Sequence, residues 1–528
     1  MPRSRFLSGA VTVAALSLAA SACTTGPAGG PSSDGDGSGG GTVRIGFTSD
    51  VTSFDPAKGA GATDYALTSL LYQPLIGQDD GGAFVPGLAE KWTSTPTKTT
   101  LTLKKGLTCS DGSPLTASQT VASLRRYQAE SAGALLTFGP ANAGEKTTIT
   151  GDDKTGTVTI TTSAPWGEVL AGLSGTAAGI VCKAGLDAGD ALARGAVEGA
   201  ATGPYEMAKA QRGASYELRL RKGYTVFPQY AAVPAGEPAG RLRIQIAKNE
   251  STLANQLQTG ALDLAPFTGT DAKRFGDSDN GSDNGTFTVK SAPLIRHYVG
   301  FNQRSGRPGA DPKIRKAVAQ ALSVDAFNNV FGGTGQKLTS YVDDKAPCVS
   351  TDSSLLTGTD KAAARQVLKG VVIKLEGSNA VAGGAGNSYV AEALRAAGAD
   401  VKLTNADNAT WATDVTANQG DWDLTVFPLI SGALARGGAY FLGPEPAEGG
   451  LNYGAVQNTA YARHYVAATS VTDRNAKCAA WQKAQEALLT SHDVIPLATV
   501  DVHYATRKGI SFATPTGALS LSTLRVTG

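Results

Sequence analysis

Residues 99–127, TTLTLKKGLTCSDGSPLTASQTVASLRRY, show most clearly how this chain folds locally. Polar and apolar residues alternate over 99–103, which predicts a strand with one buried face. Asp111-Gly112 is a tight-turn dipeptide, and the Ser-Pro pair after it begins the next segment. A helix is expected over 117–127, with Thr116 or Ser118 as its N-cap. The stretch therefore predicts a strand, a turn and a helix in succession.

Strands and helices alternate irregularly on both sides of this stretch. Strands are expected at 43–47, 157–162, 216–220, 242–246, 261–265, 297–301, 371–375, 401–403 and 423–427. Helices are expected at 64–75, 251–257, 312–322, 389–397 and 475–489. This mixture predicts an α/β fold. No repeat of 20–50 residues is visible, which argues against a solenoid or a propeller.

Six short blocks, in order along residues 43–330, carry a resemblance to a known family. They are SFDP (53–56) with LYQPL (71–75), VPGLAEKW (85–92), LKKGL with SDGSPLTA (103–117), TGPY (202–205), YVGFN (298–302) and DPKIRKA (311–317). Together they resemble the extracellular solute-binding proteins of ABC importers, family 5, which include oligopeptide-, dipeptide- and nickel-binding proteins. Most of these blocks also read as turns and packing elements, so they identify the fold better than the substrate.

The resemblance implies a two-lobed α/β fold of the periplasmic-binding-protein type, class II, with the ligand enclosed between the lobes. Lobe I would comprise residues 43–302, with an inserted subdomain at about 85–225, and lobe II residues 303–495. Residues 496–528 would return to lobe I. The hinge would be two crossing strands, at 298–302 and after 495–497. Closure around the ligand would be a hinge motion that the importer senses.

The N-terminus has the features of a secretion signal over residues 1–22. Arg3 and Arg5 precede an apolar stretch that is too short to span a membrane. The small residues before Cys23 resemble the lipobox of bacterial lipoproteins, of an actinobacterial type, although Ala20 stands where that pattern usually has Leu. The alternative is an ordinary Ala-x-Ala cleavage site. Residues 23–42, rich in Gly and Ser, predict a flexible tether. We therefore expect an exported protein on the outer face of the cell membrane, with a lipid on Cys23 as its one membrane contact.

Four cysteines follow Cys23, at positions 109, 182, 348 and 478. An even number in an oxidising compartment favours two disulfides, for which three pairings are possible. None of the cysteines forms a C-x-x-C pair, so neither a zinc site nor a redox motif is indicated. With the lobes that the resemblance implies, we favour Cys109–Cys182 and Cys348–Cys478, because each pair then lies within one lobe.

Composition excludes several classes of partner. The 528 residues are 41% hydrophobic, which is enough for a large folded core. Lys and Arg total 47 against 45 for Asp and Glu, and removal of a leader with two arginines and no acids leaves a neutral chain. A neutral chain gives no electrostatic basis for binding nucleic acid or an anionic membrane.

Catalytic motifs are sparse. The four histidines have no metal-binding spacing, and neither a G-x-S-x-G elbow nor a Walker A motif occurs. We expect no catalytic residue, metal or cofactor. The favoured function is a monomeric binding lipoprotein that delivers a solute, first of all a peptide, to ABC permease subunits. The alternatives are an exported hydrolase or cell-wall enzyme, and a ligand sensor with the same fold.

Candidate ligand contacts come from aromatic and charged residues near the expected cleft. The tract at 421–429, DWDLTVFPL, is similar to one in which peptide binders hold the ligand's ammonium group, but no Asp-Pro follows Phe427 here. Arg436 follows this tract and could hold a carboxylate, the alternative being a solvated loop residue. The candidates are Phe54, Tyr72, Trp166, His297, Asn302, Trp411, Trp422, Phe427, Arg436, Tyr440 and Tyr504. For each aromatic residue, packing within a lobe is the alternative. We expect aromatic faces and backbone groups to hold the ligand, with Arg436 as the one charged anchor.

Overall fold

A computed structural model describes residues 40–527, except 60, 80–81, 132, 143–145, 196, 277–281, 284, 431 and 472. The leader, Cys23 and most of the expected tether lie outside the described residues. No helix in the described part of the chain is long and apolar enough to cross a membrane.

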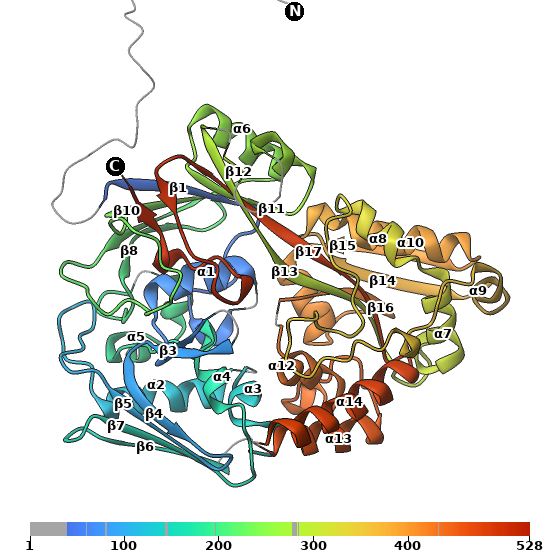
Figure 1. The fold of residues 1–528 in the computed structure, drawn as a ribbon, viewed down its shortest axis with the longest axis horizontal. Coiled ribbons are helices and arrows are strands. Elements are labelled where there is room, and N and C mark those ends of the chain that lie inside the picture. Colours follow the sequence, from blue (N-terminus) through green and yellow to red (C-terminus); the bar gives the residue numbers. More distant parts are fainter. Residues whose placement is uncertain are drawn as a thin grey trace, which may run out of the picture.

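A large mixed sheet runs through both lobes of the molecule (Figure 1). Its strands follow the order β15 (Asp400–Ala406), β14 (Val372–Ser378), β16 (Leu424–Leu429), β13 (Phe287–Phe301), β17 (Val494–Arg507), β11 (Leu264–Phe267), β1 (Thr42–Phe47), β10 (Arg241–Ile246), β9 (Ser215–Leu220) and β8 (Tyr205–Gln211). A short strand, β12 (Ser282–Asp283), pairs with β13 outside this path. We call the half that contains β1 lobe I and the half that contains β14 lobe II.

The two long central strands join the lobes. β13 and β17 pair antiparallel from Phe287 with Arg507 to Gly300 with Val494. The C-terminal part of β17 pairs with β11 of lobe I. The C-terminal part of β13 pairs with β16 of lobe II. The pairing register shifts between Pro293 and Ile295, where the strands pass from one lobe to the other. Residues 298–301, part of the segment expected to form the hinge, pair with β16 of lobe II, and residues 298–300 also pair with β17.

Lobe I carries a second, four-stranded sheet in the order β4 (Ala89–Ser94), β5 (Lys98–Leu103), β7 (Thr157–Thr162) and β6 (Thr147–Asp152). Its helices are α1 (Ala62–Leu71), α2 (Ala117–Glu130), α3 (Ala134–Phe138), α4 (Val169–Leu173), α5 (Lys183–Asp187) and α6 (Glu250–Thr259). Two small antiparallel sheets of two strands complete it, β2 (Ile76–Gln78) with β3 (Phe84–Pro86) and β18 (Ile510–Ser511) with β19 (Arg525–Val526).

Local chemistry forms the strand, turn and helix predicted over 99–127. Asp111 Oδ1 accepts hydrogen bonds from the Ser113 backbone N–H (2.9 Å) and hydroxyl (2.6 Å). Gly112 has a φ of 83°, a conformation that favours glycine. The Thr116 hydroxyl then caps α2 by accepting from Gln119 N. The cap is therefore Thr116, one of the two residues expected.

Lobe II is a sheet with helices on both faces. One face packs against α7 (Pro312–Ala321), α8 (Val324–Val330), α9 (Lys361–Leu368) and α10 (Ala385–Ala396). The other face packs against α11 (Asn408–Trp411), α12 (Leu434–Gly438), α13 (Thr459–Thr469) and α14 (Arg474–Thr490). Asp311 caps α7 and Pro312 is its first residue, as the Asp-Pro pair predicts.

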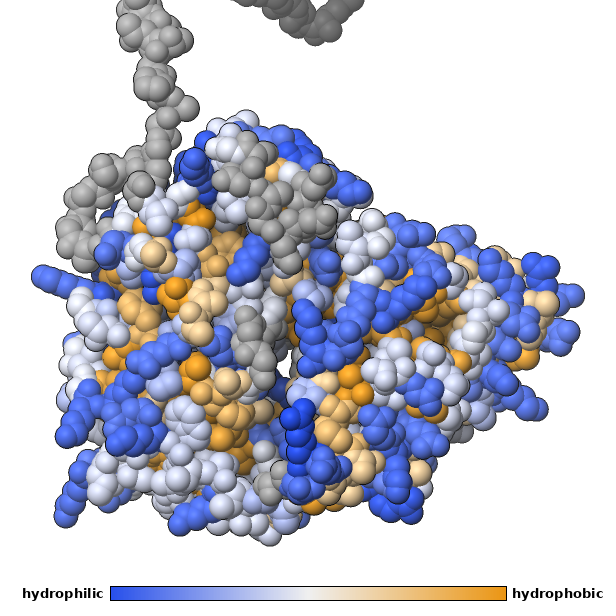
Figure 2. Space-filling model, viewed as in Figure 1, coloured by the Kyte–Doolittle hydropathy of each residue, from blue (hydrophilic) through white to orange (hydrophobic). Residues whose placement is uncertain are grey.

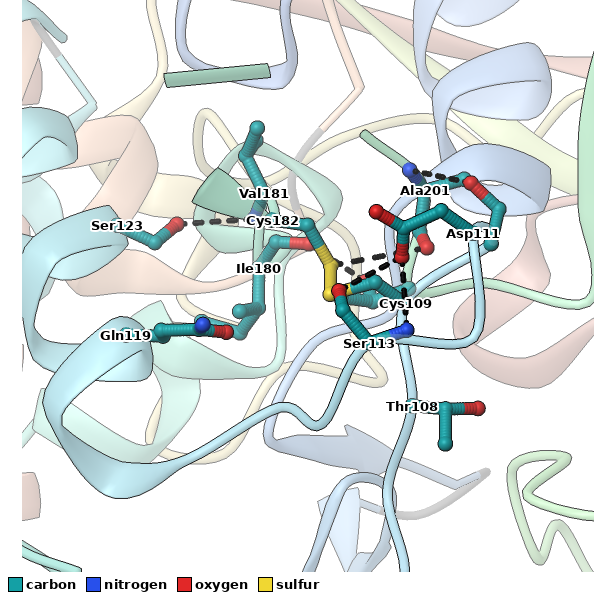
Figure 3. Close-up of a disulfide and its surroundings, with 12 residues drawn as sticks. Thr108, Cys109, Asp111, Ser113, Gln119, Ser123, Ile180, Val181, Cys182 and Ala201 are labelled. Carbon is teal, nitrogen blue, oxygen red and sulfur yellow. Dashed lines mark hydrogen bonds between the residues drawn. A yellow bond between two sulfur atoms is a disulfide. The ribbon is translucent and has the colours of Figure 1, made fainter. Parts of the chain in front are cut away.

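Two disulfides confirm the favoured pairing, Cys109–Cys182 in lobe I and Cys348–Cys478 in lobe II. Their Cα atoms lie 6.0 and 4.7 Å apart, which suits a disulfide. Figure 3 shows Cys109–Cys182 beside the turn at Asp111 and the Ser123 hydroxyl, which accepts from Val181 N. Both of these cysteines are almost fully buried. The bond therefore fastens the start of α5 to the turn that precedes α2.

Candidate functional site

A cavity of about 1850 Å³ lies between the lobes. The molecular surface is hollowed along the line where the lobes meet (Figure 2). Lobe I contributes residues from α1, α3 and α4, and lobe II contributes residues from β16, α12 and α14. The middle parts of β13 and β17 also line the cavity, so its shape depends on the angle between the lobes. We call this cavity the interlobe cleft.

An aromatic cluster forms the wall of the cleft in lobe II. Phe427 of β16 lies at its centre, with ring centroids 5.1 Å from Trp411, 5.3 Å from Tyr440 and 5.2 Å from Tyr453. The Trp411 indole N–H donates to Thr425 Oγ1 at 3.1 Å, which orients the ring. Trp411, Phe427 and Tyr440 reach the cleft. This wall offers ring faces and edges to an apolar or aromatic part of a ligand.

Arg436 extends from α12 of lobe II toward lobe I. A Cβ built on Gly175 of lobe I would lie 3.0 Å from Arg436 Nη2, so the guanidinium lies against that turn. Its charge acts on the phenols of Tyr65 and Tyr127 in lobe I and of Tyr440 in lobe II. Burial raises the pKa of all three tyrosines, which therefore stay protonated. Among the described residues, Arg436 forms neither an ion pair nor a side-chain hydrogen bond that would occupy its donors.

A second arginine of the cleft is already neutralised. Arg296 of β13 pairs with Asp343, and both side chains are almost fully buried. Its Nε donates to Asp343 Oδ2 at 2.9 Å, and its Nη1 donates to Leu294 O and Ile430 O. The pair contributes no net charge to the cleft.

Two carboxylates that line the cleft in lobe I, those of Asp64 and Glu250, are occupied by backbone donors. Asp64 accepts from Thr52 N (2.7 Å) and Gly61 N (3.0 Å). Glu250 accepts from Thr268 N (2.7 Å) and Gly269 N (2.9 Å). These bonds hold loops in place, so the carboxylates act as structural groups. The unoccupied charge of Arg436 therefore favours an anionic or strongly polarised group on the ligand.

The lobes touch at the side of the cleft opposite the hinge strands. Lys477 Nζ of α14 donates to Glu168 Oε1 at 2.8 Å, and Gly167 N donates to Thr469 O at 3.0 Å. The Lys477 and Glu168 side chains are 24% and 22% exposed. The structure therefore has the lobes in contact around the cleft.

The structure brings five of the sequence-predicted site residues to the cleft: Trp411, Phe427, Arg436, Tyr440 and Tyr504. Tyr504 comes from β17, where its hydroxyl accepts from Leu519 N.

The other six candidates pack within the lobes and are not among the residues that line the cleft. They are Phe54, Tyr72, Trp166, His297, Asn302 and Trp422. Phe54 packs edge-on against Tyr216, and Tyr72 lies in the lobe I core. The Trp166 indole donates to Thr137 O. Phe54 and Tyr72 therefore belong to the interior of lobe I, whereas the Trp166 ring also lies beside Tyr465 of lobe II, with ring centroids 6.4 Å apart.

His297, Asn302 and Trp422 have packing roles in lobe II. His297 stacks on Phe331, and burial lowers its pKa to about 3, so the ring is neutral. The Asn302 amide donates to Trp422 O, and the Trp422 ring lies beside Tyr453. His297 and its neighbour Arg296 point to opposite faces of β13, because side chains alternate along a strand. The arginine therefore faces the cleft and the histidine faces the core.

Several cleft residues were not predicted from the sequence: Tyr65, Arg296, Asp343, Lys345 and Trp481. Arg296 did carry a signal, because a charge follows directly on the apolar run Ala292–Ile295 within the strand. The loop with Asp343 and Lys345 carried none, because its place depends on packing between segments far apart in the chain. No group of three or more His, Cys, Asp or Glu side chains in the described ranges could hold a metal ion.

Comparisons with known proteins agree with this geometry. A family model described as bacterial extracellular solute-binding proteins, family 5 Middle, matches residues 83–435. A substrate-binding protein from Microbacterium hydrocarbonoxydans, solved in complex with 4-hydroxybenzoate hydrazide, is 37% identical with a TM-score of 0.85. That similarity covers 92% of this chain and 100% of the other.

A solved structure with lower sequence identity shares the fold, and a second protein matches over a short segment. The binding protein DppA from Helicobacter pylori, solved with the peptide STSA, is 18% identical with a TM-score of 0.78, over 93% of this chain and 99% of that one. The periplasmic murein peptide-binding protein MppA of Escherichia coli K12 is 36% identical over 75 residues. That match spans 14% of this chain and 14% of the length of MppA.

Proposed function

The chain belongs to the bacterial extracellular solute-binding proteins, family 5, and from this premise we propose that it captures an organic solute in the interlobe cleft and delivers it to the permease of an ABC importer. The observation that carries the proposal is the cavity of about 1850 Å³, which is lined by both lobes and by the two hinge strands. A ligand that contacts both walls favours the closed arrangement over the open one, which is the signal that a permease can read.

For the solute, we propose a short peptide that carries an aromatic or apolar side chain and a free carboxylate. The aromatic wall around Phe427 would bind the side chain, and Arg436 would bind the carboxylate. A second candidate is an aromatic acyl compound, favoured by the 37% identical relative that was solved with 4-hydroxybenzoate hydrazide. Its ring would pack on the same wall and its acyl oxygen would face Arg436.

Native mass spectrometry of the purified protein tests both candidates, because a closed cleft retains its solute through gentle purification. A mass increment equal to a peptide supports the first candidate, and one equal to an aromatic acyl compound supports the second. Titration with 4-hydroxybenzoate hydrazide and with a set of aromatic dipeptides gives affinities. Absence of any bound solute together with no binding of either class would contradict the proposal.

Arg436→Ala tests the anionic anchor. If Arg436 holds a ligand carboxylate in the closed cleft, its removal weakens binding by about 2–5 kcal/mol, because the partner charge stays buried and unpaired. Calorimetry at two ionic strengths is the measurement, with Arg436→Lys as the matched control that keeps the charge. A loss below about 1 kcal/mol that fades with salt would place the guanidinium at the rim instead.

We further propose that the mature protein is held on the outer face of the membrane by a lipid on Cys23. The support is the small-residue stretch before that cysteine and the flexible composition of residues 23–42. The native chain should partition with membranes, and Cys23→Ala should be released or left unprocessed. Equal soluble partitioning of both forms would refute the anchor.

A further inference from the structure

The disulfide Cys348–Cys478 joins two segments that both line the interlobe cleft. Residues 345–348 form one continuous strip of its lining. Lys477 and Trp481, on either side of Cys478 in α14, form another. The disulfide is therefore part of this wall, because Cys348 itself lines the cleft, whereas neither Cys109 nor Cys182 does.

Hydrogen bonds around the Cys348–Cys478 disulfide also join the loop at Cys348 to α14. Gln485 of α14 donates to Cys348 O at 3.0 Å and accepts from Ser350 N at 2.9 Å. Cys348 itself has a φ of 66°, a left-handed conformation that costs free energy for a residue other than glycine. The loop is therefore held in a conformation that it would not favour alone.

The joined segments connect to both lobes. Asp343, at the start of the loop, pairs with Arg296 of the hinge strand β13. Lys477, next to Cys478, pairs with Glu168 of lobe I at 2.8 Å. The disulfide thus lies between a contact to the hinge and a contact to the opposite lobe.

The two disulfides differ in access as well as in place. Cys109 and Cys182 are 2% and 1% exposed. Cys348 and Cys478 are both partly exposed. A reductant can therefore reach the cleft disulfide in the folded protein more readily than the buried one.

We propose that Cys348–Cys478 is a positioning element of the binding site, which keeps residues 343–348 and the first half of α14 in the geometry that receives the solute. This inference rests on the proposed function of the cleft. If this wall had to become ordered when the solute binds, binding would lose conformational entropy. The disulfide restricts the wall before binding and so reduces that loss. Opening this bond therefore weakens solute binding, and opening Cys109–Cys182 does not.

Paired variants test the proposal, with Cys348→Ala/Cys478→Ala as the perturbation and Cys109→Ala/Cys182→Ala as the matched control. Hydrogen exchange of the solute-free proteins is the first measurement. We expect amide exchange over 343–350 and 474–482 to be at least about tenfold faster in the cleft variant and unchanged in the control. Reducing the folded wild-type protein briefly, followed by alkylation, gives the same comparison without refolding a variant.

Calorimetry with 4-hydroxybenzoate hydrazide and an aromatic dipeptide is the second measurement. We expect the Kd to rise about tenfold or more in the cleft variant and to change less than twofold in the control. Unchanged exchange over the two segments, or equal weakening by both variants, would overturn the proposal. If the wild-type protein binds neither probe, the proposed solute classes fail, and the exchange experiment still decides whether the disulfide orders the wall.

Discussion

The buried pair of Arg296 and Asp343 provides the sharpest test of how the cleft is held together. Arg296 belongs to β13 at the point where that strand passes between lobes, and Asp343 belongs to the loop that leads to Cys348. Their side chains are only 6% and 2% exposed. We predict that Asp343→Asn, which keeps the shape and removes the charge, destabilises the protein strongly.

The expected loss of unfolding free energy in Asp343→Asn follows from the contacts that Arg296 keeps and the one that it loses. In Asp343→Asn the guanidinium keeps its bonds to Leu294 O and Ile430 O but loses its counter-charge in a nearly dry site. Breaking a buried pair by removing one partner costs about 3–5 kcal/mol. Replacing both partners by apolar residues, Arg296→Met with Asp343→Leu, leaves no unpaired charge and costs much less than the sum of the single changes.

Urea unfolding followed by circular dichroism gives the free energies of the wild type, of Asp343→Asn, of the single variants Arg296→Met and Asp343→Leu, and of their double variant. We expect a coupling energy of about 2–3 kcal/mol from this cycle. A loss below about 1 kcal/mol for Asp343→Asn would show that the pair behaves like an exposed one, and the account of a dry, self-neutralised pair would be refuted. The same conclusion would follow if the free-energy changes of the two single variants added up to that of the double variant.

Three further predictions concern contacts elsewhere in the molecule. Lys477→Met removes the ion pair with Glu168, so small-angle scattering of the solute-free variant should indicate a more open form than that of the wild type. High salt should shift the wild-type profile toward that of the variant, and identical profiles of the two proteins would contradict this prediction. Burial, together with the neighbouring Asp414 carboxylate, raises the pKa of Glu376 to about 7, so the folded state holds a proton that the unfolded state loses from about pH 4.5 upward. Stability should therefore fall as the pH rises between those values, and Glu376→Gln should reduce that slope in urea titrations at several pH values. Removing Cys109–Cys182 should cost about 2–4 kcal/mol in the same unfolding assay, and an unchanged midpoint would argue against its structural role.

The fold class and much of the local structure could be predicted from the sequence alone. The turn at Asp111-Gly112 and the cap at Asp311 depend on neighbouring residues, so short-range chemistry was enough to predict them. The mixed α/β class followed from hydrophobic periodicity, which is also local. The pairing of the cysteines needed one further step, the assignment of each to a lobe.

The set of residues that face the cleft became known from the three-dimensional structure and not from the sequence. Arg296 and His297 are adjacent in one strand, yet the arginine lines the cleft and the histidine packs against Phe331. Which face of β13 looks toward the other lobe depends on pairing with β16 and β17, from distant parts of the chain. The same holds for Arg436, whose nearest neighbours include Gly175 of the opposite lobe. A site assembled from two lobes is defined by contacts of long sequence separation, and the local patterns that predict helices and strands contain no information about them.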